Sequence, residues 1–184
     1  MDKNFSTPYY QPGIDQDVAY LFSAPGQEEE KAGRPAAGKT GMHLTILITI
    51  LRYRGLTFLP FREQATVDNA YPNVLYEKMS GRTEGSDQEI LAPENLRRLA
   101  SEIGHIEKWL VCFGSKAHLA AGKAQEMGLL HPSCRLVKSK HLSPRVINFI
   151  DKDIHGEVLE GGGFWNLCRR LEVLAEELYV QFKD

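Results

Sequence analysis

The sequence has few cysteines and no long hydrophobic run. Its three cysteines, Cys112, Cys134 and Cys168, are far apart and form no CxxC pair. Neither a zinc site nor a disulfide framework is therefore indicated, and a reducing compartment is expected. The longest apolar stretch, 44–51, has eight residues including two threonines, whereas a membrane-spanning helix needs about 20. Because the N-terminus also lacks an apolar signal core, we expect a cytoplasmic protein without a membrane partner.

An excess of positive charge is also missing. Lysine and arginine total 22 against 24 aspartates and glutamates in 184 residues, a net charge of -2. This excludes a uniformly basic nucleic-acid binder but not a local basic face. Residues 127–150 contain no acidic side chain. They carry Arg135, Lys138, Lys140 and Arg145. An edge that binds phosphates, with an affinity that falls as salt rises, is therefore compatible with the overall charge.

Short apolar runs alternate with amphipathic segments along the chain. Strand-like runs lie at 17–23, within 64–75, at 109–113 and at 135–140, and helical spacing covers 44–51, 93–106, 116–127 and 164–182. The polar stretches 27–41 and 78–88 indicate loops. We expect an N-terminal arm (1–16) and one α/β domain (17–184) with three α/β/α layers around a mostly parallel four-stranded sheet. Ligands of such sheets bind beyond the carboxyl ends of the strands.

One motif in the polar stretch suggests a nucleotide-binding protein. Residues 33–40, GRPAAGKT, satisfy the phosphate-binding pattern GxxxxGK[ST], and 146–151 resemble a strand that ends in a magnesium-binding aspartate. That loop should follow a buried strand directly, but here the acidic run 28–30 precedes it. Negative charge before a triphosphate site is unfavourable. A P-loop protein that depends on Lys39 and Thr40 therefore stays the minority alternative.

A longer pattern covers the same residues. Residues 19–41, AYLFSAPGQEEEKAGRPAAGKTG, resemble the first motif of the uracil-DNA glycosylase superfamily, closest to the bacterial and archaeal family four, which reads roughly GEAPGxxEDxxGRPFVGxAG. The matching residues are Ala24, Pro25, Gly26, the glutamates 28–30, Gly33, Arg34, Pro35, Gly38 and Gly41. Asn69, the run WLVCFGSKA at 109–117 and HLSP at 141–144 follow in the order of the family's later motifs. A second HPS string, at 131–133, precedes the last strand and indicates a loop.

The resemblance implies a DNA glycosylase that works without metal or cofactor and without an obligate protein partner. Such an enzyme flips a base out of DNA and hydrolyses its N-glycosidic bond to leave an abasic site. It implies that His141 donates a hydrogen bond to the departing base, that Asn69 reads the base edge and that Ser23 orients water. From the residues alone, His141 is equally a cap for backbone groups and Asn69 equally a turn residue.

The first motif departs from the family at two places. Where relatives carry a glutamate this chain has Ser23, and where they carry an aspartate or asparagine it has Ala24. A glutamate of the run 28–30 is a possible substitute, although for at least two of the three a bracing or solvated role is favoured. The phenylalanine that stacks on uracil is replaced by Ala36, followed by Ala37. Unless Tyr71 fills the space, the pocket, with Ala24, Pro25 and Gly26 in its wall, is wider than a uracil pocket.

We therefore expect a base larger than plain uracil, such as a hypermodified phage cytosine removed in anti-phage defence. Excision of uracil in repair and an inactive DNA-binding relative are the alternatives. Lys39, Lys140, Ser143 and Arg145 are the expected DNA contacts, with Arg145 at the position where relatives present a wedge to the duplex. An ordinary surface arginine is the other interpretation of Arg145.

Overall fold

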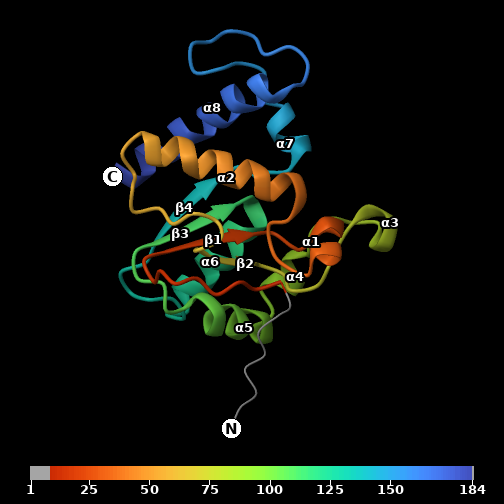
Figure 1. Cartoon of the computed structure of the whole chain (residues 1–184). Coiled ribbons are helices and arrows are strands. Elements are labelled where there is room, and N and C mark those ends of the chain that lie inside the picture. Colours follow the sequence, from red (N-terminus) through yellow and green to blue (C-terminus); the bar gives the residue numbers. More distant parts are fainter. Residues whose placement is uncertain (1–8, 184) are drawn as a thin grey trace.

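The computed structural model describes residues 9–183. Its centre is a four-stranded, entirely parallel sheet in the order β2-β1-β3-β4 (Figure 1). The strands are β1 (Val18–Phe22), β2 (Thr66–Asn69), β3 (Trp109–Phe113) and β4 (Arg135–Ser139). The predicted α/β fold with a four-stranded sheet is confirmed.

Helices cover both faces of this sheet. Val18, Tyr20 and Phe22 of β1 pack on one face against α2 (Gly38–Tyr53) and α8 (Phe164–Lys183). The alternate residues Ala19 and Leu21 pack on the other face against α5 (Pro93–Ile103) and α6 (Ser115–Glu126). A strand buried on both sides explains why 18–22 is continuously apolar. Figure 1 shows the three resulting layers.

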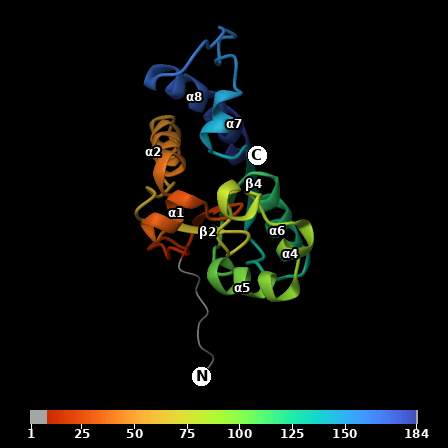
Figure 2. The ribbon, with the colours of Figure 1, turned by 90° about the vertical axis from the view of Figure 1, so that its right-hand side faces the viewer.

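The shorter helices gather after the carboxyl ends of the strands. Helix α1 (Gln27–Ala32) follows β1, α3 (Glu77–Ser80) and α4 (Asp87–Ile90) follow β2, and α7 (Pro144–Asn148) follows β4. Figure 2 looks onto this edge, with α1 and α7 in view. The Ser143 hydroxyl caps α7 by accepting the Val146 N–H, and Pro144 occupies its first turn.

Several predicted boundaries are wrong in detail. The polar stretch 27–41 contains α1 and the first turn of α2, and 78–88 overlaps the one-turn helices α3 and α4. Helix α6 begins at Ser115, one residue before the predicted 116, and its N-cap is Gly114, with φ 100°. Residues 144–148 are helical, so the strand that a P-loop protein needs at 146–151 is not there.

Part of the N-terminal segment packs against the sheet. Residues 1–8 of the predicted arm lie outside the described residues. Gln11 forms an antiparallel bridge with Val67, and each backbone N–H donates to the other's carbonyl at 2.9 Å. Residues 9–16 therefore run beside β2. Between residues 9 and 183 no helix has the length and apolar character needed to cross a membrane.

A buried charge network lies under the carboxyl end of β2. The Arg98 guanidinium contacts both carboxyl oxygens of Asp68, at 3.0 and 3.1 Å, and the Glu102 carboxylate at 2.5 Å. It also donates to the carbonyl of Asn69 at 2.8 Å. One guanidinium cannot neutralise two buried carboxylates, and burial raises the pKa of Asp68 well above its usual range. The network therefore holds a proton that an unfolded Asp68 would lose.

This raised pKa predicts a pH-dependent stability. Between about pH 5 and pH 8 the folded chain binds more protons at Asp68 than the unfolded chain, so the free energy of unfolding falls as pH rises. Asp68→Asn removes the ionisable group but can still accept hydrogen bonds from Arg98. We expect urea unfolding of this variant to show a weaker fall than the wild type over that range. If the free energy of unfolding depends on pH in the same way in both proteins, folded Asp68 does not hold the extra proton.

Candidate active site

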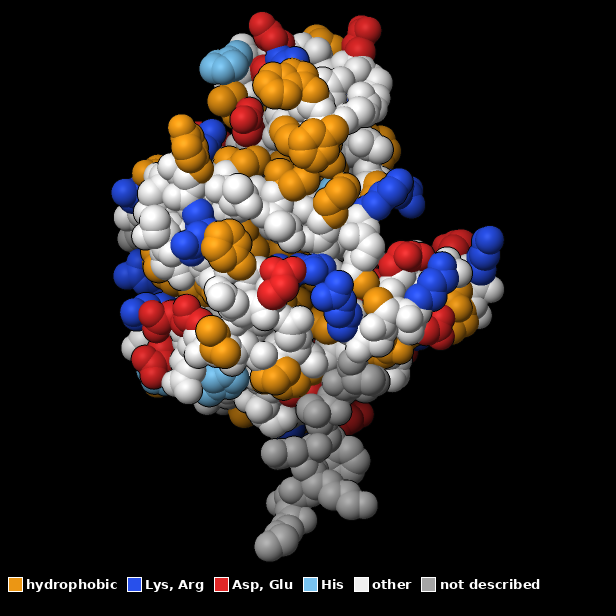
Figure 3. Space-filling view, in the orientation of Figure 1, with side chains coloured by type: hydrophobic (Ala, Val, Ile, Leu, Met, Phe, Trp, Pro, Cys, Tyr) orange, Lys and Arg blue, Asp and Glu red, His pale blue; other side chains and the backbone are white. Residues whose placement is uncertain are grey.

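A cavity of about 470 Å³, called the central cavity below, opens at the carboxyl ends of β1 and β2. It lies beside the point where the chain crosses from one side of β1 to the other, the usual ligand position in such sheets. Predicted site residues that line it are Ala24, Gly26, Ala36, Asn69, His141, Ser143 and Arg145. Figure 3 shows the molecule hollowed between the part that carries α7 and the projecting part that carries α3.

His141 follows β4 and is held as a neutral imidazole. Its Nδ1 accepts the Ser143 backbone N–H at 3.0 Å, so the ring proton lies on Nε2. Burial lowers the pKa of His141 below its usual value, against an opposing effect of the negative charge of Glu84. The ring meets Phe22 edge-on, with centroids 5.9 Å apart. The ring of His141, which lines the central cavity, is therefore a neutral N–H donor.

A second histidine fixes the loop that carries His141. His43 is buried on α2, and its Nδ1–H donates to the carbonyl of Leu142 at 2.7 Å. Burial lowers the pKa of His43, so it too is neutral. The sequence assigns no role to this residue, because nothing in the sequence around it identifies a partner. The contact anchors the turn between β4 and α7.

Ser23 is buried and is not among the residues that line the central cavity. Only 2% of the residue is exposed, and its Oγ has no hydrogen-bond partner within residues 9–183. A Cβ at Gly114 would stand 3.0 Å from this hydroxyl and 3.5 Å from the ring of His141. With φ at +100°, Gly114 therefore meets both a steric and a backbone requirement. The predicted role of Ser23 in orienting water stays a prediction.

The glutamate in the middle of the first motif braces its loop. Glu29 accepts the N–H of Gly26 through Oε2 and that of Ala37 through Oε1, both at 3.0 Å. These bonds tie the start of α1 to the start of α2, since Gly26 and Ala37 are the residues that precede the two helices. A Cβ at Gly41 would come within 1.9 Å of the Ala36 carbonyl oxygen, so the motif also needs a glycine there. Glu29 therefore has the bracing role that the sequence favoured for such a residue.

Ala36 and Asn69 both line the central cavity. Ala36 has φ +47°, and its carbonyl accepts a hydrogen bond from Arg62 at 3.0 Å. The wide pocket that its small side chain predicts stays a prediction. Asn69 is buried at the end of β2, and its Nδ2 donates to the carbonyl of Tyr9 at 3.3 Å. Its reading of a base edge stays a prediction.

Some predicted pocket residues lie elsewhere. Tyr71 does not fill the space left at Ala36, because its hydroxyl donates to Glu89 at 3.2 Å outside the central cavity. Tyr76 lines the cavity instead. Pro25 is buried beside it, and its carbonyl accepts the Leu75 N–H at 2.8 Å. Ala37 and the exposed Lys39 line a separate hollow next to α1. The GxxxxGK[ST] match thus follows a helix, not a strand.

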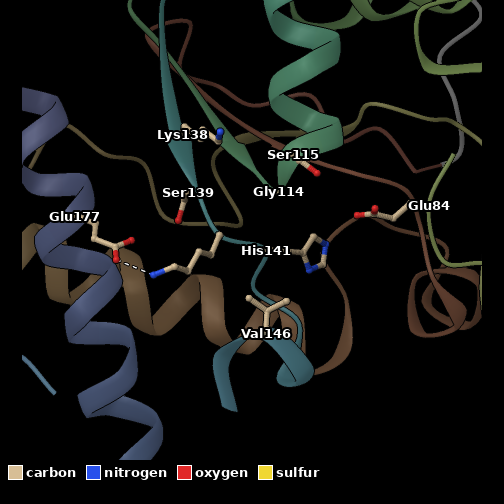
Figure 4. A pocket seen from close by; sticks show the side chains of 9 residues that line it. Glu84, Gly114, Ser115, Lys138, Ser139, His141, Val146 and Glu177 are labelled. Carbon is tan, nitrogen blue, oxygen red and sulfur yellow. Dashed lines mark hydrogen bonds and ion pairs between the residues drawn. The ribbon is translucent and has the colours of Figure 1, made fainter. Parts of the chain in front are cut away.

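A side cavity of about 510 Å³ adjoins the first and shares Glu84, His141 and Val146 with it. Figure 4 shows part of its lining, with Glu84 and Val146 near the ring of His141. Ser115, Ser139 and Lys140 also line it. Lys140 is paired with Glu177 at 2.7 Å, so the basic edge predicted from the sequence is partly neutralised. Arg145 is exposed and lines the central cavity.

Other lining residues have no signal in the sequence. Phe22 and Tyr76 supply aromatic rings, and Glu84 supplies a carboxylate from the loop between α3 and α4. Phe22 looks like any apolar strand residue, and Glu84 lies in a segment without periodicity. Only the fold brings them to His141.

Metal ligands do not gather in the described part of the chain, where no three His, Cys, Asp or Glu side chains come together. The arrangement instead offers neutral and charged hydrogen-bonding groups around an apolar floor. The chain matches no known protein-family model and no curated protein sequence.

Proposed function

We propose that this protein is a DNA glycosylase that hydrolyses the N-glycosidic bond of a flipped base. The observation that carries the proposal is the neutral His141, which lines a cavity at the carboxyl edge of the sheet and, with Nδ1 accepting the Ser143 N–H, carries its ring proton on Nε2. The resemblance of the motifs at 19–41 and 141–144 to the uracil-DNA glycosylase superfamily supports the same activity.

The chemistry needs a donor of this kind. As the bond between the sugar C1′ and the base nitrogen stretches, the base gains negative charge and the sugar becomes oxocarbenium-like. A fixed N–H aimed at the base stabilises that charge without being reorganised during the reaction. A neutral donor keeps its proton, so the base leaves as an anion held by the Nε2–H of His141.

The size of the cavity supports a base larger than uracil. Its volume of about 470 Å³ falls in the range of pockets for drug-sized ligands, and a bare pyrimidine does not fill it. Ala36 leaves one wall open, while Phe22 and Tyr76 provide aromatic surface. A cytosine with a bulky substituent fits this description. Removal of such bases from phage DNA, in defence of the host, is the role that we propose.

DNA would approach the rim formed by α7 and the loop after β4. Arg145 extends from the first turn of α7 at the mouth of the central cavity. Its proposed role is to enter the space left by the flipped base or to contact a phosphate. Lys138 and Lys140 line the adjoining side cavity. Phosphate contacts of this kind make the affinity for DNA fall with salt.

An abasic-site assay tests the proposal. Duplexes that carry uracil, hypoxanthine or a bulky 5-substituted cytosine are incubated with wild type and with His141→Ala. We expect the wild type, but not His141→Ala, to form abasic sites at the substituted cytosine. DNA binding without abasic sites on any duplex would favour an inactive relative, and magnesium-dependent ATP binding would favour the P-loop alternative.

Substitution of Ala36 tests the wide pocket. Ala36→Phe places a ring where the cavity is open, so we expect excision of the bulky cytosine to fall at least tenfold. The same ring can stack on uracil, a contact worth about 1–3 kcal/mol per base, so uracil excision should rise. Rates on the two duplexes give the comparison, with Ala36→Gly as the control for backbone changes. Efficient wild-type excision of uracil that the phenylalanine impairs would contradict the wide pocket.

A further inference from the structure

The first motif leaves the central cavity without an available carboxylate. Ser23 stands at the position where relatives carry a glutamate, but it is 2% exposed and does not line the cavity. Glu29 does line it, but both of its carboxylate oxygens accept backbone hydrogen bonds. A water molecule that attacks the sugar therefore needs another partner.

Glu84 has a position that suits this role. It is half-buried in the loop between α3 and α4 and lines both cavities together with His141. Within residues 9–183 its carboxylate makes no hydrogen bond or ion pair. Figure 4 shows the carboxylate and the ring of His141 pointing toward one another across the side cavity. The two are near enough for the charge of Glu84 to act on the pKa of His141.

We propose that Glu84 binds and activates the water that hydrolyses the N-glycosidic bond. This rests on the proposed function. The water oxygen forms a bond to C1′ while the bond from C1′ to the base nitrogen breaks, and the electron pair of that bond goes to the base. One water proton passes to the Glu84 carboxylate and then to the departed base. The products are the free base and an abasic sugar with a hydroxyl at C1′.

The opposed positions of the two groups suit the two halves of this reaction. The neutral N–H of His141 stabilises negative charge on the base, and the anionic carboxylate stabilises positive charge on the sugar. Glu84 lies in a segment outside the first motif, so the α3–α4 loop supplies what Ser23 and Ala24 lack. The catalytic carboxylate of this protein therefore comes from the part of the chain after β2.

Glu84→Gln tests this role because it keeps the shape and loses the ability to accept a proton. General-base catalysis typically raises a rate by about 10²–10⁴-fold. We expect a loss of that size in the single-turnover rate of base release, measured on the duplex from which the wild type releases its base fastest. Affinity for that duplex should stay within about threefold. Glu77→Gln is the matched control, since it removes an equal charge from the exposed start of α3 in the same region.

Chemical rescue separates a catalytic role from a structural one. Glu84→Ala should be inactive alone, and added formate should restore part of its rate, because a small carboxylate can occupy the vacated site. If the wild type is active and Glu84→Gln is as fast as Glu77→Gln, the role of Glu84 is overturned while the glycosylase function stands. A failure of formate to raise the rate of Glu84→Ala would also overturn it. If the wild type releases no base from duplexes with uracil, hypoxanthine or bulky cytosine, the glycosylase function is overturned and this role with it.

Discussion

Replacing His141 by alanine is expected to lower the single-turnover rate of base release by about 10²–10³-fold, the usual loss when one preorganised donor to a developing anion is removed. The reason is that His141 lines the central cavity and carries its ring proton on Nε2, since Nδ1 accepts the Ser143 N–H at 3.0 Å. Alanine removes both the donor and this contact. The measurement is the rate of abasic-site formation at saturating enzyme.

His131 offers a matched control. Its Nδ1 accepts the Ser133 backbone N–H at 3.3 Å, an arrangement like that of His141 but outside the central cavity. We expect His131→Ala to excise at the wild-type rate. Equal losses in both variants would show that the histidine turns stabilise the fold and do not act on the base.

The state of His141 also fixes the pH dependence of the rate. Because burial lowers its pKa below the usual value of about 6.5, the ring stays neutral at pH 6.5. The rate should therefore keep its plateau down to that pH and fall only in more acidic solution, where the second proton displaces the Ser143 contact. A fall that begins above neutral pH would contradict a neutral donor.

Replacing Arg98 by alanine is expected to cost about 3–5 kcal/mol in the free energy of unfolding, the range seen when one partner of a buried ion pair is removed. Only 10% of the Arg98 side chain is exposed, and it joins Asp68, Glu102 and the carbonyl of Asn69. Its loss leaves the buried carboxyl groups of Asp68 and Glu102 without the guanidinium that binds both. Urea unfolding near neutral pH measures the effect.

The adjacent Arg97 is the control, since it is exposed on the same helix. Arg97→Ala should change the free energy of unfolding by less than about 0.5 kcal/mol. The Arg98 substitution should also weaken base release near its reduced melting temperature, because Arg98 holds the end of β2 beside the central cavity. A stability loss of similar size in both variants would contradict the buried network.

The layers of the fold could be predicted because burial leaves a regular trace in the sequence. The continuous apolar run at 109–113 and the helical spacing at 164–182 correspond to β3 and α8. The one-turn helices α3 and α4 could not be predicted, because they depend on local caps such as the Ser86 hydroxyl that accepts the Glu89 N–H. Elements this short carry too few residues to show a period.

Part of the candidate site could be predicted because its motifs lie in segments that follow the carboxyl ends of strands. His141, Asn69 and Ala36 all line the central cavity, because they lie in segments whose positions follow from the parallel sheet. Tyr71 was misplaced because the exit of β2 turns it toward Glu89. Glu84 was missed because nothing local marks it, and its proximity to His141 arises only when the loop after β2 meets the loop after β4.

The identity of the released small molecule tests the central claim most directly. Wild-type protein is incubated with a duplex that contains one bulky 5-substituted cytosine, and the soluble fraction and the DNA are analysed by mass spectrometry. The proposed function predicts the intact modified base in solution and an equal amount of abasic DNA, both greatly reduced with His141→Ala. Unchanged DNA from this duplex and from the uracil and hypoxanthine duplexes would contradict it.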